Sequence, residues 1–313
     1  MKKKLTYLLL TGLLVSLLLG ACGAPAAVQP TVESGISLSD GLGRNVTLSQ
    51  PAMHIVSIAP SNTEILYAIG AGDQVVGRDE FSNYPEAALD VEMIGGGYND
   101  FNLERIAALQ PDLVLAAEIN TPETVDALEK LDIPVYYLSN PDDFEGLYEN
   151  IQTVGVLSGH ESEAQTVVNG LRTRVENTLA KLMMGNEAPT VFFELDATEP
   201  AKPWTSGGDT FVDYLINMAG GKNIAGSLDD EWAQYSQENL IVANPDIIIL
   251  ADAKWGTTVD MVLARPGWDA LSAVKNGAIY PIDDDLTSRP GPRLVDGLET
   301  LAAIFHPEVN FND

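Results

Sequence analysis

The sequence predicts an α/β fold of two similar parallel-sheet lobes joined by one long rigid helix. Three observations support this prediction. Apolar segments alternate with helical patterns, one stretch of the chain occurs twice, and a long amphipathic pattern separates the two copies. Parallel strands need a crossover connection, usually a helix, so a regular alternation of strands and helices is typical of parallel sheets.

Six short apolar segments are the predicted strands. In the predicted N-terminal lobe, 38–158, they are 54–58, 113–116 and 135–138. In the predicted C-terminal lobe, 187–313, they are 191–195, 247–250 and 278–282. Several of these segments are apolar throughout rather than at every second residue, which indicates strands buried on both faces.

One stretch of sequence occurs in both lobes. Residues 102–116 match residues 236–251, with seven residues from Glu to Pro in each copy. Each copy predicts a short capped helix, a Pro-Asp turn and a buried strand. The two lobes are therefore expected to share one architecture.

The segment between the lobes, 159–186, predicts a single long helix. Apolar residues recur at spacings of three and four over about 161–184, which gives a helix of ~36 Å with one apolar stripe. A helix packed along both lobes resists bending, so we expect small lobe motions rather than a wide hinge. An ordinary surface helix within one large domain is the alternative.

Composition and charge exclude several classes of function. The chain has 313 residues with 45% hydrophobic content, enough for two lobes with cores of their own. Its 17 basic and 45 acidic residues give a formal charge of -28, which disfavours binding to nucleic acid. One Cys and three scattered His predict neither an internal disulfide nor a metal site.

The first 21 residues have the pattern of an export signal. Lys2–Lys4 precede a leucine-rich run of about 15 residues, shorter than the roughly 20 that span a membrane, although a retained anchor is the alternative. The following LGAC, ending at Cys22, resembles the lipobox of bacterial lipoproteins. That resemblance implies cleavage before Cys22 and its acylation, which tethers the protein outside the cytoplasmic membrane. Residues 22–37 are rich in Ala, Pro and Gly and predict a flexible linker.

Motifs along residues 38–308 resemble one family of transport proteins. They are HIVSIAPSNTE (54–64), FSNYP (81–85), NLERI (102–106), PDLV (111–114), WTSG (204–207), WAQYSQE (232–238) and RPGPR (289–293). In this order they resemble the helix-bridged substrate-binding proteins of iron-complex and cobalamin ABC importers. The resemblance implies a ligand cleft between the two lobes and delivery of the ligand to a dimeric permease.

Signatures of catalysis are missing from the sequence. It contains no Gly-x-Ser-x-Gly elbow and no His-Glu-x-x-His, and Gly220–Asn223 lacks the spacing and hydroxyl of a P-loop. The acidic run 283–285 lacks the Gly turn and distant Glu of an EF-hand, so we interpret it as a solvated loop. We therefore expect no enzyme activity, no metal site and no cofactor.

Aromatic residues in stretches rich in Gly, Pro, Asn and Asp are the predicted ligand contacts. These stretches are expected to be loops beyond strand ends, where open α/β sheets bind ligands. The residues are Phe81, Tyr98, Trp204, Trp232 and Trp255. Resemblance to the cobalamin binders implies that Phe81, Tyr98 and Trp232 pack against the corrin with Trp204 nearby, but Ala117 replaces another aromatic of that set. The alternative is a structural role, in which these rings form small apolar cores at the bases of the loops.

Charged residues near the C-terminus add a second group of candidates. Prolines and a glycine in RPGPR predict a rigid turn that presents a guanidinium, which suits carboxylates, phosphates and amides. The resemblance to cobalamin binders implies that Asp285 and Arg289 meet side chains of the ligand. Arg293 is expected to be structural.

Glu104 and Glu238 occupy equivalent positions of the internal repeat. Each is expected in the first turn of a helix, where a carboxylate favours the positive end of the helix dipole by ~0.3–1 kcal/mol, so a purely structural role is an alternative. Their equivalence across the repeat favours a pair at opposite tips of one face. The family resemblance implies that both dock on the permease dimer.

Together these features predict an extracytoplasmic, lipid-anchored protein, at the cell surface or in the periplasm. It would capture cobalamin or a related corrinoid and deliver it to an ABC permease dimer; a ferric siderophore or haem is the alternative ligand. An adhesion or sensor module would keep the signal and linker but would need neither the aromatic residues nor the paired glutamates. We expect a monomer that contacts the membrane through its lipid.

Cys22→Ala is expected to leave the protein unprocessed or to release it from the membrane fraction, because the sulfur that carries the lipid is lost. Detergent-phase partitioning and metabolic lipid labelling measure this, with Thr31→Ala in the predicted linker as the control. Unchanged partitioning and labelling of the Cys22 variant would contradict acylation at this site.

Overall fold

The computed structural model describes residues 35–97, 99–182 and 188–311. The predicted signal peptide, Cys22 and Tyr98 lie outside the described residues. No helix among the described residues is long and apolar enough to cross a membrane. The first element, a hairpin of β1 (Ile36–Ser39) and β2 (Asn45–Leu48), begins two residues inside the segment predicted as linker.

The N-terminal lobe is built on a four-stranded parallel sheet in the order β4-β3-β7-β8. Its strands are β3 (Ile55–Ser57), β4 (Val75–Arg78), β7 (Leu113–Ala117) and β8 (Val135–Leu138), and all residues of β3, β7 and β8 are buried. Its helices are α2 (Pro60–Ala68), α3 (Leu103–Ala108), α4 (Pro122–Glu129) and α5 (Phe144–Ser158). It also contains 3-10 turns at Gly72–Gln74 and Glu86–Asp90. A small antiparallel ribbon is formed by β5 (Gly95–Gly96) and β6 (Asp100–Phe101). The three predicted strands are confirmed to within about a residue, and β4 is added at the edge.

The C-terminal lobe has a six-stranded sheet that is mixed rather than wholly parallel. Strands β9 (Thr190–Asp196), β13 (Ile247–Leu250) and β14 (Ile279–Pro281) are parallel, as predicted, and β11 (Lys222–Asn223) pairs with β9. Strands β10 (Trp204–Ser206) and β12 (Trp232–Gln234) extend the sheet in antiparallel pairing. Trp204 and Trp232, predicted in loops, therefore begin strands. Strands β10 and β12 do not lie in apolar segments, unlike the equally short β3 and β14, so their composition does not reveal them.

Six helices complete the C-terminal lobe within residues 188–311. They are α7 (Phe211–Met218), α8 (Gln237–Ala243), α9 (Val259–Leu263), α10 (Ser272–Asn276), α11 (Asp285–Ser288) and α12 (Leu294–Phe305), with 3-10 turns at Ala251–Trp255 and Trp268–Ala270. Helices α7 and α12 pack against each other.

The internal repeat has a structural counterpart in each lobe. Asn102 caps α3 by accepting from the Arg105 backbone N–H, and Ser236 caps α8 by accepting from Asn239. After each helix an aspartate fixes the turn: Asp112 accepts from the His54 backbone N–H at 2.9 Å, and Asp246 accepts from Thr190 at 2.9 Å. Each aspartate thereby joins the start of its own strand to the start of the neighbouring one.

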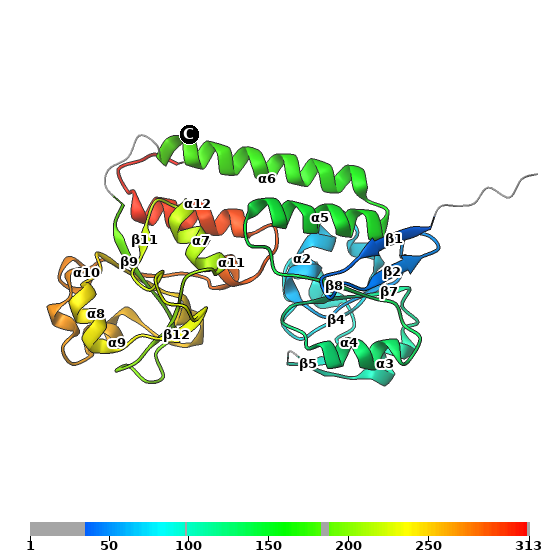
Figure 1. Ribbon diagram of the computed structural model, residues 1–313, viewed down its shortest axis with the longest axis horizontal. Helices are drawn as coiled ribbons and strands as arrows, with labels where there is room; N and C mark the ends of the chain where they lie inside the picture. The colour runs from blue at the N-terminus through cyan, green and yellow to red at the C-terminus, as the bar shows by residue number, and fades with distance from the viewer. Residues whose placement is uncertain (1–34, 98, 183–187, 312–313) are drawn as a thin grey trace, which may run out of the picture. The chain divides into compact units, whose positions relative to one another are not determined.

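Helix α6 (Glu161–Leu182) links the two lobes and lies across both α5 and α12 (Figure 1). Its buried residues, Ala164, Val168, Leu171, Val175 and Thr178, largely follow the predicted apolar stripe. The approach to α5 is close, because a Cβ at Gly155 would lie 2.6 Å from the Ala164 Cβ. Only glycine fits there without a shift of one helix.

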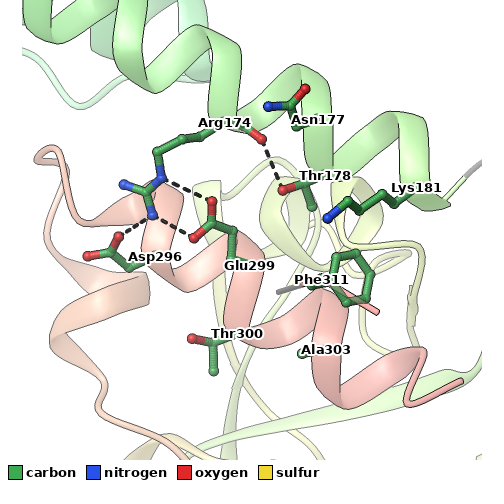
Figure 2. A pocket seen from close by; sticks show the side chains of 9 residues that line it. All are labelled: Arg174, Asn177, Thr178, Lys181, Asp296, Glu299, Thr300, Ala303 and Phe311. Carbon is green, nitrogen blue, oxygen red and sulfur yellow. Dashed lines mark hydrogen bonds and ion pairs between the residues drawn. The ribbon is translucent and has the colours of Figure 1, made fainter. Parts of the chain in front are cut away.

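Polar contacts join the other half of α6 to α12. Figure 2 shows Arg174 of α6 donating to Glu299 at 3.0 and 2.6 Å and to Asp296 at 2.5 Å. Beside them lies a groove of about 440 Å³, which Lys181 and Phe311 also line. The Arg174 side chain is 40% exposed, so the apolar stripe of α6 contributes more to this joint than the ion pairs do.

A single apolar core runs through both lobes and α6. Ile55 and Leu113 of the first sheet, Leu171 of α6, and Val191 and Ile249 of the second sheet belong to one cluster of buried residues. The opposite face of each sheet has its own smaller core, around Val114 in one lobe and Ile248 in the other. A continuous core opposes separation of the lobes, because separation exposes apolar surface at about 25 cal/mol per Å².

Candidate functional site

A pocket of about 170 Å³ lies between the lobes and is lined by residues from both. We call it the interlobe pocket. The N-terminal lobe contributes Glu118 and the segment 140–142, which follow the carboxyl ends of β7 and β8. The C-terminal lobe contributes Asp209, Thr210, Phe211, Val212, Glu231, Trp232, Thr287, Ser288, Pro290 and Leu294. Its position beyond strand ends is where open α/β sheets bind ligands.

Local hydrogen bonds fix the walls of the interlobe pocket. The Glu118 carboxylate accepts from the Asn140 backbone N–H at 2.8 Å, which holds the two N-terminal segments together. Asp209 has φ of 56°, in the left-handed region, and directly precedes Thr210, whose hydroxyl caps α7. The pocket is therefore bounded by constrained turns on both sides.

Of the aromatic residues predicted to contact the ligand, and within the described part of the chain, Trp232 lines the interlobe pocket. Its side chain is 51% exposed, large for a tryptophan. Trp204 is 41% exposed. In the register of β10 and β12, Trp204 is opposite Gln234 and Trp232 is opposite Ser206. Because residues two apart in a strand share a face, the two tryptophans lie on the same face of this pair of strands. Trp204 and Phe81 lie outside the lining of the pocket, and Trp255 is 69% exposed.

Phe81 is half-buried in a loop that a buried aspartate holds in place. Its backbone N–H donates to Asp79 Oδ2 at 2.9 Å, and the Ser82 hydroxyl donates to the same carboxyl group. Burial raises the pKa of Asp79, while the hydrogen bonds from Ser82 and Phe81 oppose the shift. Asp79 therefore positions the Phe81 loop.

Arg289 lies in an ion-pair network that crosses between the lobes. Its Nη1 is 3.3 Å from Glu64 Oε1 and 2.9 Å from Asn83 Oδ1, both in the N-terminal lobe, and its Nη2 is 3.0 Å from Asp285 Oδ1. Lys254 Nζ donates to the same Asp285 oxygen at 2.6 Å. Asp285 and Arg289 are both buried, next to Ser288 and Pro290 of the interlobe pocket.

Arg293 contacts both carboxylate oxygens of Glu64 in this network. Its Nε donates to Glu64 Oε2 at 3.0 Å and its Nη2 to Glu64 Oε1 at 2.6 Å, while its guanidinium lies 4.1 Å from the centre of the Tyr84 ring. Glu64 is only 3% exposed. One buried carboxylate of α2 thus holds two guanidiniums of the other lobe, and Arg293 has a structural position, as the sequence indicated.

The acidic run 283–285 brings three carboxylate oxygens within 4.8 Å of one another. Two cations of the protein, Lys254 and Arg289, are paired with Asp285. The run is thus part of the ion-pair network, and we assign no metal to it.

Glu104 and Glu238 are exposed and occupy the same position in their helices. Each is the second residue of its helix, α3 or α8, and among the described residues neither carboxylate has a recorded hydrogen bond or ion pair. Helices α3 and α8 lie in different lobes, on the side away from α6 (Figure 1). Both carboxylates are thus available to a partner.

Two groups of candidate residues were not identified from the sequence. Glu64 lies in an otherwise uncharged helix and shows no sign in the sequence of its distant arginine partners. The carboxylates of the interlobe pocket, from Glu118, Asp142, Asp209 and Glu231, come from four separate segments. A signal did exist for Glu118, because it directly follows a buried strand.

Two α/β lobes with a pocket between them are an arrangement that solute-binding proteins use. Residues 55–286 match the periplasmic binding protein family. The chain therefore belongs to this family.

Individual relatives agree with this assignment. The ABC transporter substrate-binding lipoprotein YvrC of Bacillus subtilis (strain 168) is 34% identical over 307 residues, 95% of each chain. The vitamin B12-binding protein of Yersinia pestis (strain Pestoides F) is 30% identical over 254 residues, 81% of this chain and 86% of that protein. The periplasmic haem-binding protein RhuT of Roseiflexus sp. RS-1, in its apo form, has a TM-score of 0.74 at 27% identity, covering 82% of this chain and 98% of that one.

Glu64→Gln is expected to lower the free energy of unfolding by ~3–5 kcal/mol, because two buried guanidiniums lose their shared counter-charge. Urea denaturation followed by circular dichroism measures this. The control is Glu145→Gln, which removes the carboxylate of an exposed pair with Arg172 and should change stability little. Equal losses in the two variants would show that the network does not hold the lobes together.

Proposed function

We propose that this chain is the solute-binding component of an ABC importer and that its ligand is cobalamin or a related corrinoid. The observation that carries the proposal is the interlobe pocket, which both lobes line and at which Trp232 leaves half its surface exposed. An exposed indole at a cleft is suited to stack on a flat macrocycle. The relative that binds vitamin B12, at 30% identity, supports the corrinoid within this class.

Haem is the second candidate, favoured by the structural similarity to the haem-binding protein RhuT. Both ligands are flat macrocycles, so stacking on Trp232 does not separate them. The first experiment is therefore the absorption spectrum of the protein after incubation with cyanocobalamin, haem or a ferric siderophore, followed by desalting. Retention of the corrinoid bands supports the proposal, and retention of only haem or the ferric chelate contradicts it.

We further propose that Cys22 carries a lipid that holds the protein outside the cytoplasmic membrane. The lipobox-like LGAC supports this, as does the similarity to the lipoprotein YvrC along 95% of the chain. Glu104 and Glu238 are the proposed contacts to the permease. Their equivalent places in the repeat suit a partner with two-fold symmetry.

Trp232→Ala is expected to weaken corrinoid binding by ~1–3 kcal/mol, the range of a stacked aromatic at the centre of an interface. Isothermal titration calorimetry with cyanocobalamin, on protein beginning at residue 35, measures the change. Trp255→Ala is the matched control, because that indole is more exposed and lies outside the pocket lining. Equal affinity of the Trp232 variant and the wild type would remove this residue from the binding site.

Glu104→Ala combined with Glu238→Ala is expected to reduce stimulation of the transporter's ATPase while leaving ligand affinity unchanged. Truncating one partner of a desolvated charge pair costs ~2–5 kcal/mol of binding, and these carboxylates lie on helices that do not line the pocket. The measurement is ATP hydrolysis by the permease complex in liposomes.

The matched control is Glu123→Ala combined with Asp260→Ala. These acidic residues also lie in the first turns of helices, α4 and α9, so they share the interaction with the helix dipole. If both double variants stimulate the ATPase as the wild type does, Glu104 and Glu238 only stabilise their helices.

A further inference from the structure

The interlobe pocket is too small to enclose a macrocycle. Its volume of about 170 Å³ lies below the ~300–1,000 Å³ of sites that bury a whole small ligand. The continuous core beneath it opposes a wide opening of the lobes. A corrin or porphyrin bound at this site would therefore lie across the mouth of the pocket beside Trp232, with its peripheral substituents directed into the pocket.

Four carboxylate residues line the pocket that such substituents would enter. Glu118 and Asp142 belong to the N-terminal lobe, and Asp209 and Glu231 to the C-terminal lobe, so the acidic lining surrounds the pocket. All four residues are exposed. Among the described residues that line the pocket, none is Lys, Arg or His.

The nearest basic side chain of the adjoining loop does not offset this charge. Arg289 lies between the lining residues Ser288 and Pro290, but its side chain is only 10% exposed and is paired with Asp285 and Glu64. Lys254 is paired with Asp285 as well. The cations close to the pocket are thus already neutralised by carboxylates of the network.

We infer that the acidic lining makes the pocket select macrocycles with uncharged, hydrogen-bond-donating substituents and reject those with carboxylate substituents. Carboxylates accept hydrogen bonds and do not donate them, so they suit the N–H groups of primary amides. A carboxylate substituent of the ligand would meet the like charge of these four residues in a partly desolvated site, and this repulsion disfavours binding. This inference rests on the proposed function and assigns the amide periphery of a corrinoid, rather than the propionates of haem, to these four residues.

The test compares two corrins that share one ring. Dicyanocobinamide carries amide side chains, whereas dicyanocobyrinic acid carries carboxylates in their place, and excess cyanide keeps both cobalt centres in the same state. The wild type is expected to bind the amide probe at least ~10-fold more tightly, as measured by quenching of tryptophan fluorescence. Equal affinity for the two probes would overturn the inference.

A charge-removal variant locates the effect in the pocket. Glu118→Gln, Asp142→Asn, Asp209→Asn and Glu231→Gln together keep hydrogen-bond acceptors in place. Asn also tolerates the left-handed backbone at residue 209. This variant is expected to bind the carboxylate probe at least ~10-fold more tightly than the wild type does, with a smaller change for the amide probe.

The control variant changes the same number of exposed acids outside the pocket: Glu123→Gln, Asp126→Asn, Glu149→Gln and Asp260→Asn. It has the same net charge as the pocket variant and is expected to keep the wild-type preference. If both variants lose the preference equally, the overall charge of the protein causes it, and the inference is wrong.

A porphyrin pair separates this inference from the proposed function. Haemin carries two propionates, and its dimethyl ester carries none. Binding of porphyrins but not of corrins contradicts the proposed ligand, while a preference for the ester over haemin still supports selection by charge. Tight binding of haemin with no preference for the ester overturns both, and so does binding of none of the four probes.

Discussion

The buried carboxylate of Glu64 is the contact on which the relation between the two lobes depends. It lies in α2 of one lobe and accepts from Arg289 and Arg293 of the other. A carboxylate that is 3% exposed is strongly destabilised without such partners. Separation of the lobes on this side would break the contacts of Glu64 with both arginines, so the network favours one relative position.

The continuous core and the long helix reinforce this constraint. Helix α6 packs on α5 and α12, and the cluster of buried residues runs from one sheet to the other without a break. Opening the lobes would therefore disrupt apolar packing and ion pairs together. We expect a binding site under this constraint to keep nearly the same shape with and without its ligand, so that its selectivity rests on the residues already in place around the pocket.

The sequence predicts the strands that form apolar segments and the elements that are repeated. It does not predict contacts between residues that are far apart along the chain. The apolar segments that became β7, β8 and β13 bury four or more consecutive residues, which leaves a clear pattern. Strands β10 and β12 have three residues each, and their pairing depends on the neighbouring strand rather than on their own composition. Glu64 and Arg293 are separated by 229 positions, and no local pattern indicates that they meet.

The internal repeat places Glu104 and Glu238 at equivalent positions, but it does not extend to the residues of the interlobe pocket. Glu104 and Glu238 stand at equivalent positions, so a partner that contacts both meets the same helix start twice. The interlobe pocket is not built from equivalent positions: Glu118 follows β7, whereas Trp232 begins the antiparallel strand β12, which has no counterpart in the sheet β4-β3-β7-β8 that the described residues form. In the function proposed above, this duplicated architecture would present equivalent helix starts to the permease and bind the ligand in an asymmetric site. The added strands of the C-terminal sheet create this asymmetry, because they carry the tryptophan to the mouth of the pocket.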